Sequence, residues 1–324
     1  MKELRIGNIS LAVKDYYCKS ADSFSSSCGT DSDYLVKDDP KLWLYVNVTD
    51  RCNAGCQFCV SHSNPANTEV AKIDSFRKAL EVARPYIYGV SFTGGEPMLY
   101  PAVLDELISV TDEMMPDDSE IDIVTNGTSC SSLCELKNID RLTTIHISRH
   151  STEDERNDRI MGFHAPGLIE LKELISSVND PGKFVLNCVL QDGGVDSMEA
   201  AAKYLDMAID IGVQNSCFIT MLDVNPSCKD RQVRVDNWPV FSDSGCELWN
   251  SSHEYAQFNV WNRYHDYSYC SCLSGSYSNL HGRTRFYFRS PGADIAPDYC
   301  RQLVYTADNK LRDGFGQHRT VIWE

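Results

Sequence analysis

The sequence predicts an α/β protein whose centre is a parallel sheet. Strand-like and helix-like segments alternate without a break from about residue 42 to residue 222. Each strand-like segment is short and apolar, and the segments between them carry apolar residues at helical spacing. Alternation of this kind is typical of a parallel α/β sheet, although by itself it does not distinguish a barrel from an open sheet.

Six segments are predicted as strands. In chain order they are Leu42–Val48, Gly89–Thr93, Ile121–Thr125, Thr144–Ser148, Phe184–Leu190 and Cys217–Leu222. The helices between them have recognisable ends: Pro85 stops the helix Asp74–Arg84, and Pro101 suits the first turn of the next helix. Asp196, followed by Glu199, is expected to begin the last of these helices.

Composition divides the chain into three regions. Residues 1–41 are expected to be an N-terminal extension with a polar loop, and residues 42–230 hold the alternating pattern. Residues 231–324 contain four of the five tryptophans and half of the sixteen tyrosines, and helical periodicity fades there. This last region is expected to form a small, loop-rich domain that depends on metal and aromatic packing.

Charge and hydropathy exclude several classes of function. The net charge is −16, and residues 231–324 are neutral, so the acidic excess lies in residues 1–230. This argues against a general nucleic-acid binder, which needs a basic face. No apolar run approaches the roughly 20 residues of a membrane span, and the N-terminus lacks the apolar stretch of a signal peptide. Fourteen cysteines without a secretion signal indicate reduced thiols and metal ligation in a cytoplasmic protein with no membrane partner.

A cysteine triplet carries the strongest chemical signal. Cys52, Cys56 and Cys59 have the spacing C-x3-C-x2-C directly after the first predicted strand. Four thiolates are the usual complement of a four-iron cluster, so three would leave one iron free to bind another molecule. A structural zinc site is the alternative, because His62 could supply the fourth ligand that closed zinc sites need.

A second motif, Gly94-Gly95-Glu96-Pro97, ends the second predicted strand. With the triplet, it resembles the radical S-adenosylmethionine (SAM) superfamily. The resemblance implies a partial (β/α)6 barrel in which the open iron of a [4Fe-4S] cluster chelates the methionine amine and carboxylate of SAM. It also implies one-electron reduction of SAM to a 5′-deoxyadenosyl radical, which abstracts a hydrogen atom from the substrate. Glu96 follows two glycines, which let the backbone come close, so its carboxylate is expected to approach an amine.

Further strand ends match SAM-binding positions of the superfamily. Asn126, in Thr125-Asn126-Gly127, ends the third strand, and Ser148 ends the fourth. Asn187 lies on the fifth strand, and the backbone around Met221 is expected to border the adenine. Each residue alone also fits an ordinary turn, and their order behind successive strands is what favours the SAM site.

The cysteines of the C-terminal region form a second constellation. Cys246, Cys270, Cys272 and Cys300 match the complement of an auxiliary [4Fe-4S] cluster, and Cys228 is the nearest substitute. The alternative is that some of them are buried free thiols, because cysteine often serves as a small core residue.

The molybdopterin-pathway GTP 3′,8-cyclases are the closest resemblance. Residues 48–53 (Val-Thr-Asp-Arg-Cys-Asn) are similar to their cluster loop, and residues 299–312 to their auxiliary-cluster segment. The substrate-binding part differs: Gln302 and Val304 stand where the cyclases have basic residues that grip GTP. Gly314 stands where their last cluster cysteine would fall, and the C-terminal double glycine is missing. The sequence is therefore expected to belong to a related enzyme of the twitch or SPASM auxiliary-cluster type, and not to a GTP cyclase.

The expected activity is hydrogen abstraction from a ribosomally made peptide, ending in a crosslink, an epimerisation or an oxidation. The alternative substrate is a small natural-product intermediate such as an aminocyclitol, sugar or nucleoside, and a non-catalytic iron–sulfur or zinc protein is a second alternative. An epimerase would need a hydrogen donor, for which Cys188 and Cys217 on the last two strands are candidates. A flavodoxin or ferredoxin is the expected reductant.

Overall fold

The computed structural model describes the predicted strand–helix region almost completely and the two ends of the chain in part. The described residues are 2–13, 16–18, 35–37, 39, 41–61, 65–221, 226–233, 258–262, 271–277, 283–288, 300, 302–315 and 319–324. His62, Leu222, Cys246 and Cys270 lie outside them, and Cys272 is described by its backbone alone.

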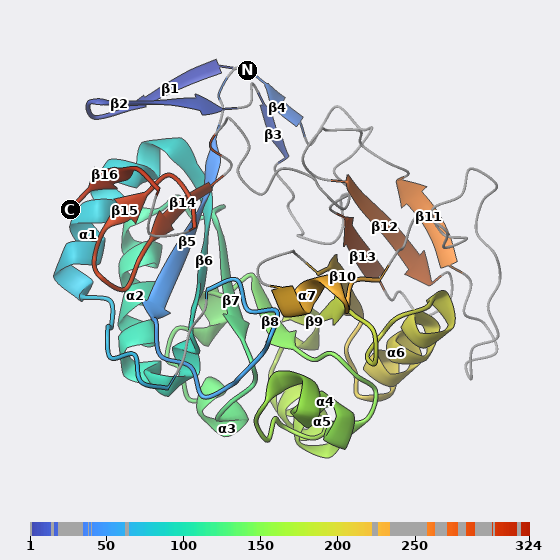
Figure 1. Cartoon of the computed structure of the whole chain (residues 1–324). Helices are drawn as coiled ribbons and strands as arrows, with labels where there is room; N and C mark the ends of the chain where they lie inside the picture. The colour runs from blue at the N-terminus through green and yellow to red at the C-terminus, as the bar shows by residue number, and fades with distance from the viewer. Residues whose placement is uncertain are drawn as a thin grey trace.

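Six parallel strands form the centre of the protein (Figure 1). They are β5 (Leu42–Thr49), β6 (Ile87–Gly94), β7 (Glu120–Thr125), β8 (Thr144–Ser148), β9 (Phe184–Leu190) and β10 (Asn215–Thr220). From β6 to β10, each strand pairs in parallel with the strand that precedes it in the chain. All six predicted strands are confirmed, and the parallel order agrees with the expected partial barrel.

Helices α1 to α6 connect these strands, and α7 follows β10 and lies against the loop that leaves β5 (Figure 1). They are α1 (Ile73–Ala83), α2 (Pro101–Met114), α3 (Cys130–Leu133), α4 (Asp154–Met161), α5 (Leu168–Ser177), α6 (Met198–Asp210) and α7 (Pro226–Lys229). Short 3-10 turns are η1 (Arg84–Tyr86), η2 (Pro97–Leu99), η3 (Ile139–Arg141) and η4 (Pro181–Lys183). The cap of α6 differs from the prediction: Ser197 accepts the Ala200 N–H, because its hydroxyl lies one residue closer to the helix than Asp196.

Strands from the C-terminal region extend the sheet at both edges. β14 (Gln302–Tyr305) pairs in parallel with β5, and β15 (Leu311–Arg312) and β16 (Val321–Trp323) follow it. At the other edge, β13 (Arg283–Phe288) pairs in parallel with β10, followed by β12 (Ser271–Tyr277) and β11 (Phe258–Asn262).

The N-terminus contributes two hairpins. They consist of β1 (Lys2–Ile6) with β2 (Ile9–Val13), and β3 (Tyr16–Cys18) with β4 (Leu35–Lys37). Ile6, Leu11 and Val13 are buried in the same core as the central strands. The first hairpin therefore shares the core of the sheet. None of the described helices has the length and apolar character required to cross a membrane.

The two faces of the sheet differ in chemistry, and this positions the site. Alternate side chains such as Val46, Phe92 and Ile123 belong to the apolar core that includes the helices. Because side chains alternate along a strand, the residues between them point to the opposite face. We call this opposite side the inner face. It is largely polar and carries, among others, Asn47, Ser91, Asp122, Thr144, His146, Ser148, Asn187 and Cys217.

Candidate active site

The cysteine triplet lies on the cysteine loop, residues 50–61, which leaves the end of β5. Burial, with smaller contributions from the neighbouring Cys59 and Cys52, raises the pKa of the Cys56 thiol to about 12. Burial is also the main cause that raises the pKa of Cys52, with a smaller contribution from Cys59. The three sulfurs therefore lie within electrostatic reach of one another.

Two glycines at the end of β6 hold the start of this loop. The Gly95 N–H donates to the Thr49 carbonyl at 2.6 Å, and the Glu96 N–H donates to the Arg51 carbonyl at 2.8 Å. A Cβ at Gly95 would lie 2.0 Å from that Arg51 oxygen, and Gly94 has a φ of +121°. Only glycine permits this approach, so the motif works through its backbone.

The Glu96 carboxylate joins the ends of β6 and β7. It is fully buried and accepts hydrogen bonds from the Met98 N–H at 2.9 Å, the Thr125 hydroxyl at 2.6 Å and the Asn126 N–H at 2.6 Å. Burial raises the pKa of Glu96 to about 7, and these donors partly oppose the rise. The carboxylate therefore faces the chain's own donors, while the Glu96 backbone faces the cysteine loop. Pro97 follows as the first residue of η2.

Asn126, directly after β7, contacts the first cysteine. Its amide donates to the Asn53 side-chain oxygen at 2.9 Å and lies 4.0 Å from the Cys52 sulfur. The Asn53 amide in turn donates to the Thr128 hydroxyl at 2.7 Å, and the Ala54 N–H donates to the Cys52 sulfur at 3.4 Å. Two N–H groups thus point at one sulfur, an arrangement that favours a thiolate.

The C-terminus of α4 holds the middle of the loop. The Met161 carbonyl accepts the Gly55 N–H at 2.8 Å and the Cys56 thiol at 3.6 Å. Gly162 ends the helix with a φ of +70°, and a Cβ there would lie 3.0 Å from the Gly55 Cα. The loop and the helix end meet backbone to backbone.

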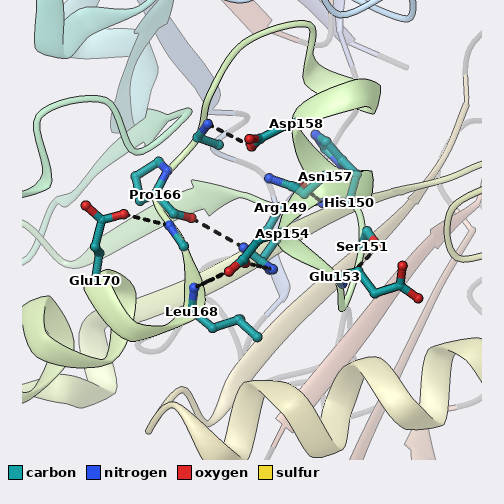
Figure 2. Close-up of polar contacts among 12 residues, drawn as sticks. Arg149, His150, Ser151, Glu153, Asp154, Asn157, Asp158, Pro166, Leu168 and Glu170 are labelled. Atoms are coloured by element: carbon teal, nitrogen blue, oxygen red, sulfur yellow. Dashed lines mark hydrogen bonds and ion pairs between the residues drawn. The ribbon is translucent and has the colours of Figure 1, made fainter.

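A polar network after β8 positions α4 (Figure 2). Arg149 is 1% exposed, and its guanidinium donates to Asp154 at 2.6 Å and to the Pro166 carbonyl at 3.4 Å. The His150 N–H donates to the Asn157 side chain at 2.8 Å. Asp154 and Asn157 both belong to α4, so these contacts fix the helix to the end of β8.

His150 links this network to the cysteine loop. Its Nδ1 accepts the Val189 N–H at 3.0 Å, which places the ring proton on Nε2. Burial, and to a lesser degree Arg149, lowers the pKa of His150 to about 3, so the ring is neutral. The ring contacts Phe58 edge to face at 4.8 Å, directly before Cys59.

Comparison with known families decides the identity of this arrangement. The profile of the Radical SAM superfamily matches residues 46–222, which is more than half of the chain. The chain belongs to the radical SAM superfamily. The match spans β5 to β10, and therefore the cysteine loop and every strand end described above.

Radical SAM relatives of known activity are similar at low identity. The GTP 3′,8-cyclase of a Nostoc species is 25% identical over 226 residues, which cover 66% of this chain and 62% of the cyclase. The GTP 3′,8-cyclase of Mycobacterium marinum is 30% identical over 156 residues, which cover 43% of this chain and 42% of the cyclase. Human molybdenum cofactor biosynthesis protein 1 is 25% identical over 158 residues, which cover 47% of this chain and 24% of the human protein. The chain spans less than two thirds of the length of each of these relatives.

Solved radical SAM structures are also similar. Streptococcus suis SuiB bound to precursor peptide SuiA has a TM-score of 0.46 and 20% identity, covering 57% of this chain and 40% of SuiB. Native anSMEcpe with bound AdoMet and a Cp18Cys peptide has a TM-score of 0.41 and 15% identity, covering 57% and 52%. Likeness at this level concerns the fold alone.

A radical SAM enzyme uses a [4Fe-4S] cluster and SAM, and the residues present fit both. The three thiols form the donor set that leaves one iron open. Three buried polar side chains at the carboxyl ends of β5, β8 and β9 carry atoms without a hydrogen-bond partner among the described residues: Asn47, Arg149 and Gln191. A polar ligand is what such atoms require. Within the described residues, no three His, Cys, Asp or Glu side chains are arranged to hold a single metal ion.

The other residues expected at the SAM site lie at the same edge of the sheet. Ser148 ends β8 and is the register partner of Asn187 in the middle of β9, and both face inward. The Asn187 side chain lies 3.1 Å from the His146 ring, and its carbonyl accepts the Arg149 N–H. Met221 follows β10, and its carbonyl accepts the Gln232 amide at 3.4 Å.

The two candidate hydrogen donors lie on opposite faces. Cys188 is fully buried in the core on the helix side. Cys217 packs with Val185 and Ile219 on the inner face, level with Asn187. Burial raises the pKa of Cys188 far above its usual range, with a smaller contribution from Cys217. Cys188 therefore fits a neutral thiol, and only Cys217 shares a face with the SAM-site residues.

The described C-terminal cysteines lie in different places. Cys300 is buried, its thiol donates to the Gln302 and Asp313 carbonyls, and its N–H donates to the Ala12 carbonyl. Burial raises the pKa of the Cys300 thiol to about 12. Cys228 on α7 lies against the cysteine loop, 3.7 Å from the Gln57 carbonyl. Cys246, Cys270 and the Cys272 side chain are outside the description, so the second cluster remains a prediction.

Sequence analysis did not single out Asp122 and His146, which meet on the inner face. The His146 ring lies 3.9 Å from the Asp122 carboxylate and 3.1 Å from Asn187. The sequence did carry a signal for these two residues: polar residues at alternate positions of an apolar strand indicate the face that is not packed on helices.

Proposed function

We propose that this chain abstracts a hydrogen atom from an organic substrate. When bound, the cluster and SAM supply the 5′-deoxyadenosyl radical for this step. The observation that carries the proposal is the cysteine loop, which carries three thiols at C-x3-C-x2-C spacing and is held by hydrogen bonds from Gly95, Asn126 and Met161.

Within that reaction, each group of residues has a separate task. Cys52, Cys56 and Cys59 hold the cluster, and the backbone of Gly94 and Gly95 lets SAM approach it. Glu96 fixes Asn126 near the first cysteine. Ser148, Asn187 and the Met221 backbone are proposed to hold the ribose, the carboxylate and the adenine of SAM.

The leading substrate is a ribosomally made peptide, modified at a side chain or an α-carbon. SuiB, which shares the fold, is seen with a precursor peptide. If the product is an epimer, Cys217 is the proposed hydrogen donor because it shares the inner face with Asn187.

A small hydroxylated or aminated natural product is the second candidate. The inner face favours it, since Asp122, Thr144, His146 and Asn187 form a connected polar surface there. An auxiliary [4Fe-4S] cluster held by Cys246, Cys270, Cys272 and Cys300 remains part of the proposal. So does a cytoplasmic reductant of the flavodoxin or ferredoxin class.

Release of 5′-deoxyadenosine tests the central proposal. The protein is reconstituted anaerobically with iron and sulfide, reduced in the presence of SAM, and analysed by liquid chromatography. Wild type is expected to release 5′-deoxyadenosine, and Cys56→Ala is expected to lose at least about 100-fold, because loss of a cluster ligand removes the cluster. Cys134→Ala is the matched control, since Cys134 is exposed and lies outside the loop. A zinc-only protein, or equal activity in Cys56→Ala, would refute the proposal.

A further inference from the structure

Three hydrogen bonds form a closed ring beside the cysteine loop. The Thr128 N–H donates to the Asn126 side-chain oxygen at 2.9 Å, and the Asn126 amide donates to the Asn53 side-chain oxygen at 2.9 Å. The Asn53 amide in turn donates to the Thr128 hydroxyl at 2.7 Å. The ring therefore joins the turn after β7 to the residue that directly follows Cys52.

The ring fixes the direction of both side-chain amides. A backbone N–H can only donate, so the Thr128 N–H requires the oxygen of Asn126 and leaves the NH₂ group of Asn126 to face Asn53. Asn53 must then present its oxygen to that group, and its own NH₂ group faces the Thr128 hydroxyl, which can accept. Turning either amide over would place two donors or two acceptors face to face in at least one of these contacts.

One proton of the Asn126 amide remains for the Cys52 sulfur. An NH₂ group has two protons, and the ring uses one of them for Asn53. The same nitrogen lies 4.0 Å from the Cys52 sulfur. The Asn126 N–H is held by Glu96 at 2.6 Å, so the backbone and the side chain of Asn126 are both anchored. The Cys52 sulfur therefore faces a donor whose direction is set by other residues.

The Cys56 sulfur has the opposite environment, because it lies 3.6 Å from the Met161 carbonyl, which is an acceptor. Hydrogen bonds to the ligand sulfurs are among the features that set the reduction potential of an iron–sulfur cluster. An added electron makes these sulfurs more negative, so a donor stabilises the reduced state more than the oxidised state and raises the potential. Cys52 is thus the ligand at which the described hydrogen bonds favour reduction.

We propose that Asn53 and Thr128 are positioning residues that aim the Asn126 amide at the Cys52 sulfur and thereby raise the reduction potential of the SAM cluster. The inference rests on the proposed function, because it takes the three cysteines of the loop as the cluster ligands. A reductant of the flavodoxin or ferredoxin class loses one electron and the cluster gains it, and no covalent bond of the ring changes. Thr128 acts only through the two amides, so its effect separates aiming from ligation.

A redox titration of the reconstituted protein tests this aiming role. Electron paramagnetic resonance follows cluster reduction by dithionite, and the SAM cluster is the signal that Cys56→Ala lacks. Thr128→Val keeps the side-chain shape and the backbone N–H but removes the hydroxyl that accepts from Asn53. At the wild-type midpoint it is expected to lower the ratio of reduced to oxidised cluster about tenfold, which is about 59 mV for one electron, with wild-type iron content. Thr128→Ser keeps the hydroxyl and is expected to keep the wild-type midpoint.

A double variant shows whether Thr128 acts through Asn126. Asn126→Ala removes the donor and is expected to lower the midpoint at least as far as Thr128→Val. Thr128→Val combined with Asn126→Ala is expected to match Asn126→Ala alone, because no amide is left to aim. Ser129→Ala is the matched control and is expected to keep the wild-type midpoint, since Ser129 is the exposed neighbour of Thr128 and its side chain makes no capping hydrogen bond.

An unchanged midpoint in Thr128→Val overturns the inference, and so does a lowered midpoint in Thr128→Ser. Additive shifts in the double variant, or iron loss from Thr128→Val, would assign Thr128 a structural role and overturn it as well. A wild-type protein that binds the cluster but releases no 5′-deoxyadenosine overturns the proposed hydrogen abstraction instead and leaves the comparison of midpoints valid. A wild-type protein that binds no iron–sulfur cluster overturns both.

Discussion

Replacing Gly95 with alanine is expected to displace the cysteine loop. A Cβ at Gly95 would lie 2.0 Å from the Arg51 oxygen, 2.4 Å from its carbonyl carbon and 3.0 Å from its nitrogen. All three are backbone atoms, so no side-chain rotation relieves the clash. Overpacking costs about 1–3 kcal/mol, and loss of the hydrogen bond from Glu96 to Arg51 adds about 1 kcal/mol. A total near 3 kcal/mol corresponds to roughly a 100-fold loss of the correct loop geometry.

Iron content and 5′-deoxyadenosine release measure this effect after anaerobic reconstitution. Gly95→Ala is expected to lose iron from the SAM cluster and most of its activity. Gly55→Ala is the matched control within the same loop, because its Cβ would meet nothing closer than 3.8 Å. If Gly95→Ala retained wild-type iron content and activity, the close backbone contact between Gly95 and Arg51 would not be what holds the loop.

Three further outcomes are expected. Because the folded protein keeps the Glu96 proton up to about pH 7, and the unfolded chain loses it near 4.5, the stabilising contribution of Glu96 falls by about 3 kcal/mol across that window. Thermal denaturation between pH 5.5 and 8 should therefore show a slope that Glu96→Gln flattens; an equal slope in both proteins would contradict the burial argument. Asn126→Ala removes the amide next to Cys52 and should hasten iron loss to a chelator by on the order of tenfold, with unchanged iron loss as the contrary result. Tyr204→Phe leaves the Arg149 carbonyl without its donor and should cost about 1 kcal/mol in denaturant unfolding without altering iron content.

The strands and the cysteine loop could be predicted because their signals are local. Leu42, Leu44, Val46 and Val48 alternate toward the core and lead directly into the triplet, so pattern and motif coincide. The expected backbone role of the two glycines also follows from residue type, since no other residue allows so close an approach.

Side-chain direction could not be predicted because it depends on the fold. The Glu96 carboxylate accepts hydrogen bonds from Thr125 and Asn126, which follow it by about thirty residues, and the sequence does not predict these partners. The opposite orientations of Cys188 and Cys217 depend on the parity of each strand relative to the helices. The contacts of His146 with Asp122 and Asn187 depend on the register of β7, β8 and β9, which the sequence does not give.

The structure also separates the cysteine loop from the polar side chains of the inner face. The cysteine loop is held from β6, β7 and α4, through backbone atoms of Gly95 and Met161 and through the Asn126 amide. The polar chain of Asp122, His146 and Asn187 instead consists of side chains on inner-face positions of β7, β8 and β9. Among the hydrogen bonds of the described residues, none of these inner-face side chains makes a backbone contact that holds the loop. Under the proposed function, the loop can keep one way of starting the reaction while the substrate-facing residues change, and this agrees with a chain that is similar to the GTP cyclases around its cysteines and differs from them at Gln302 and Val304.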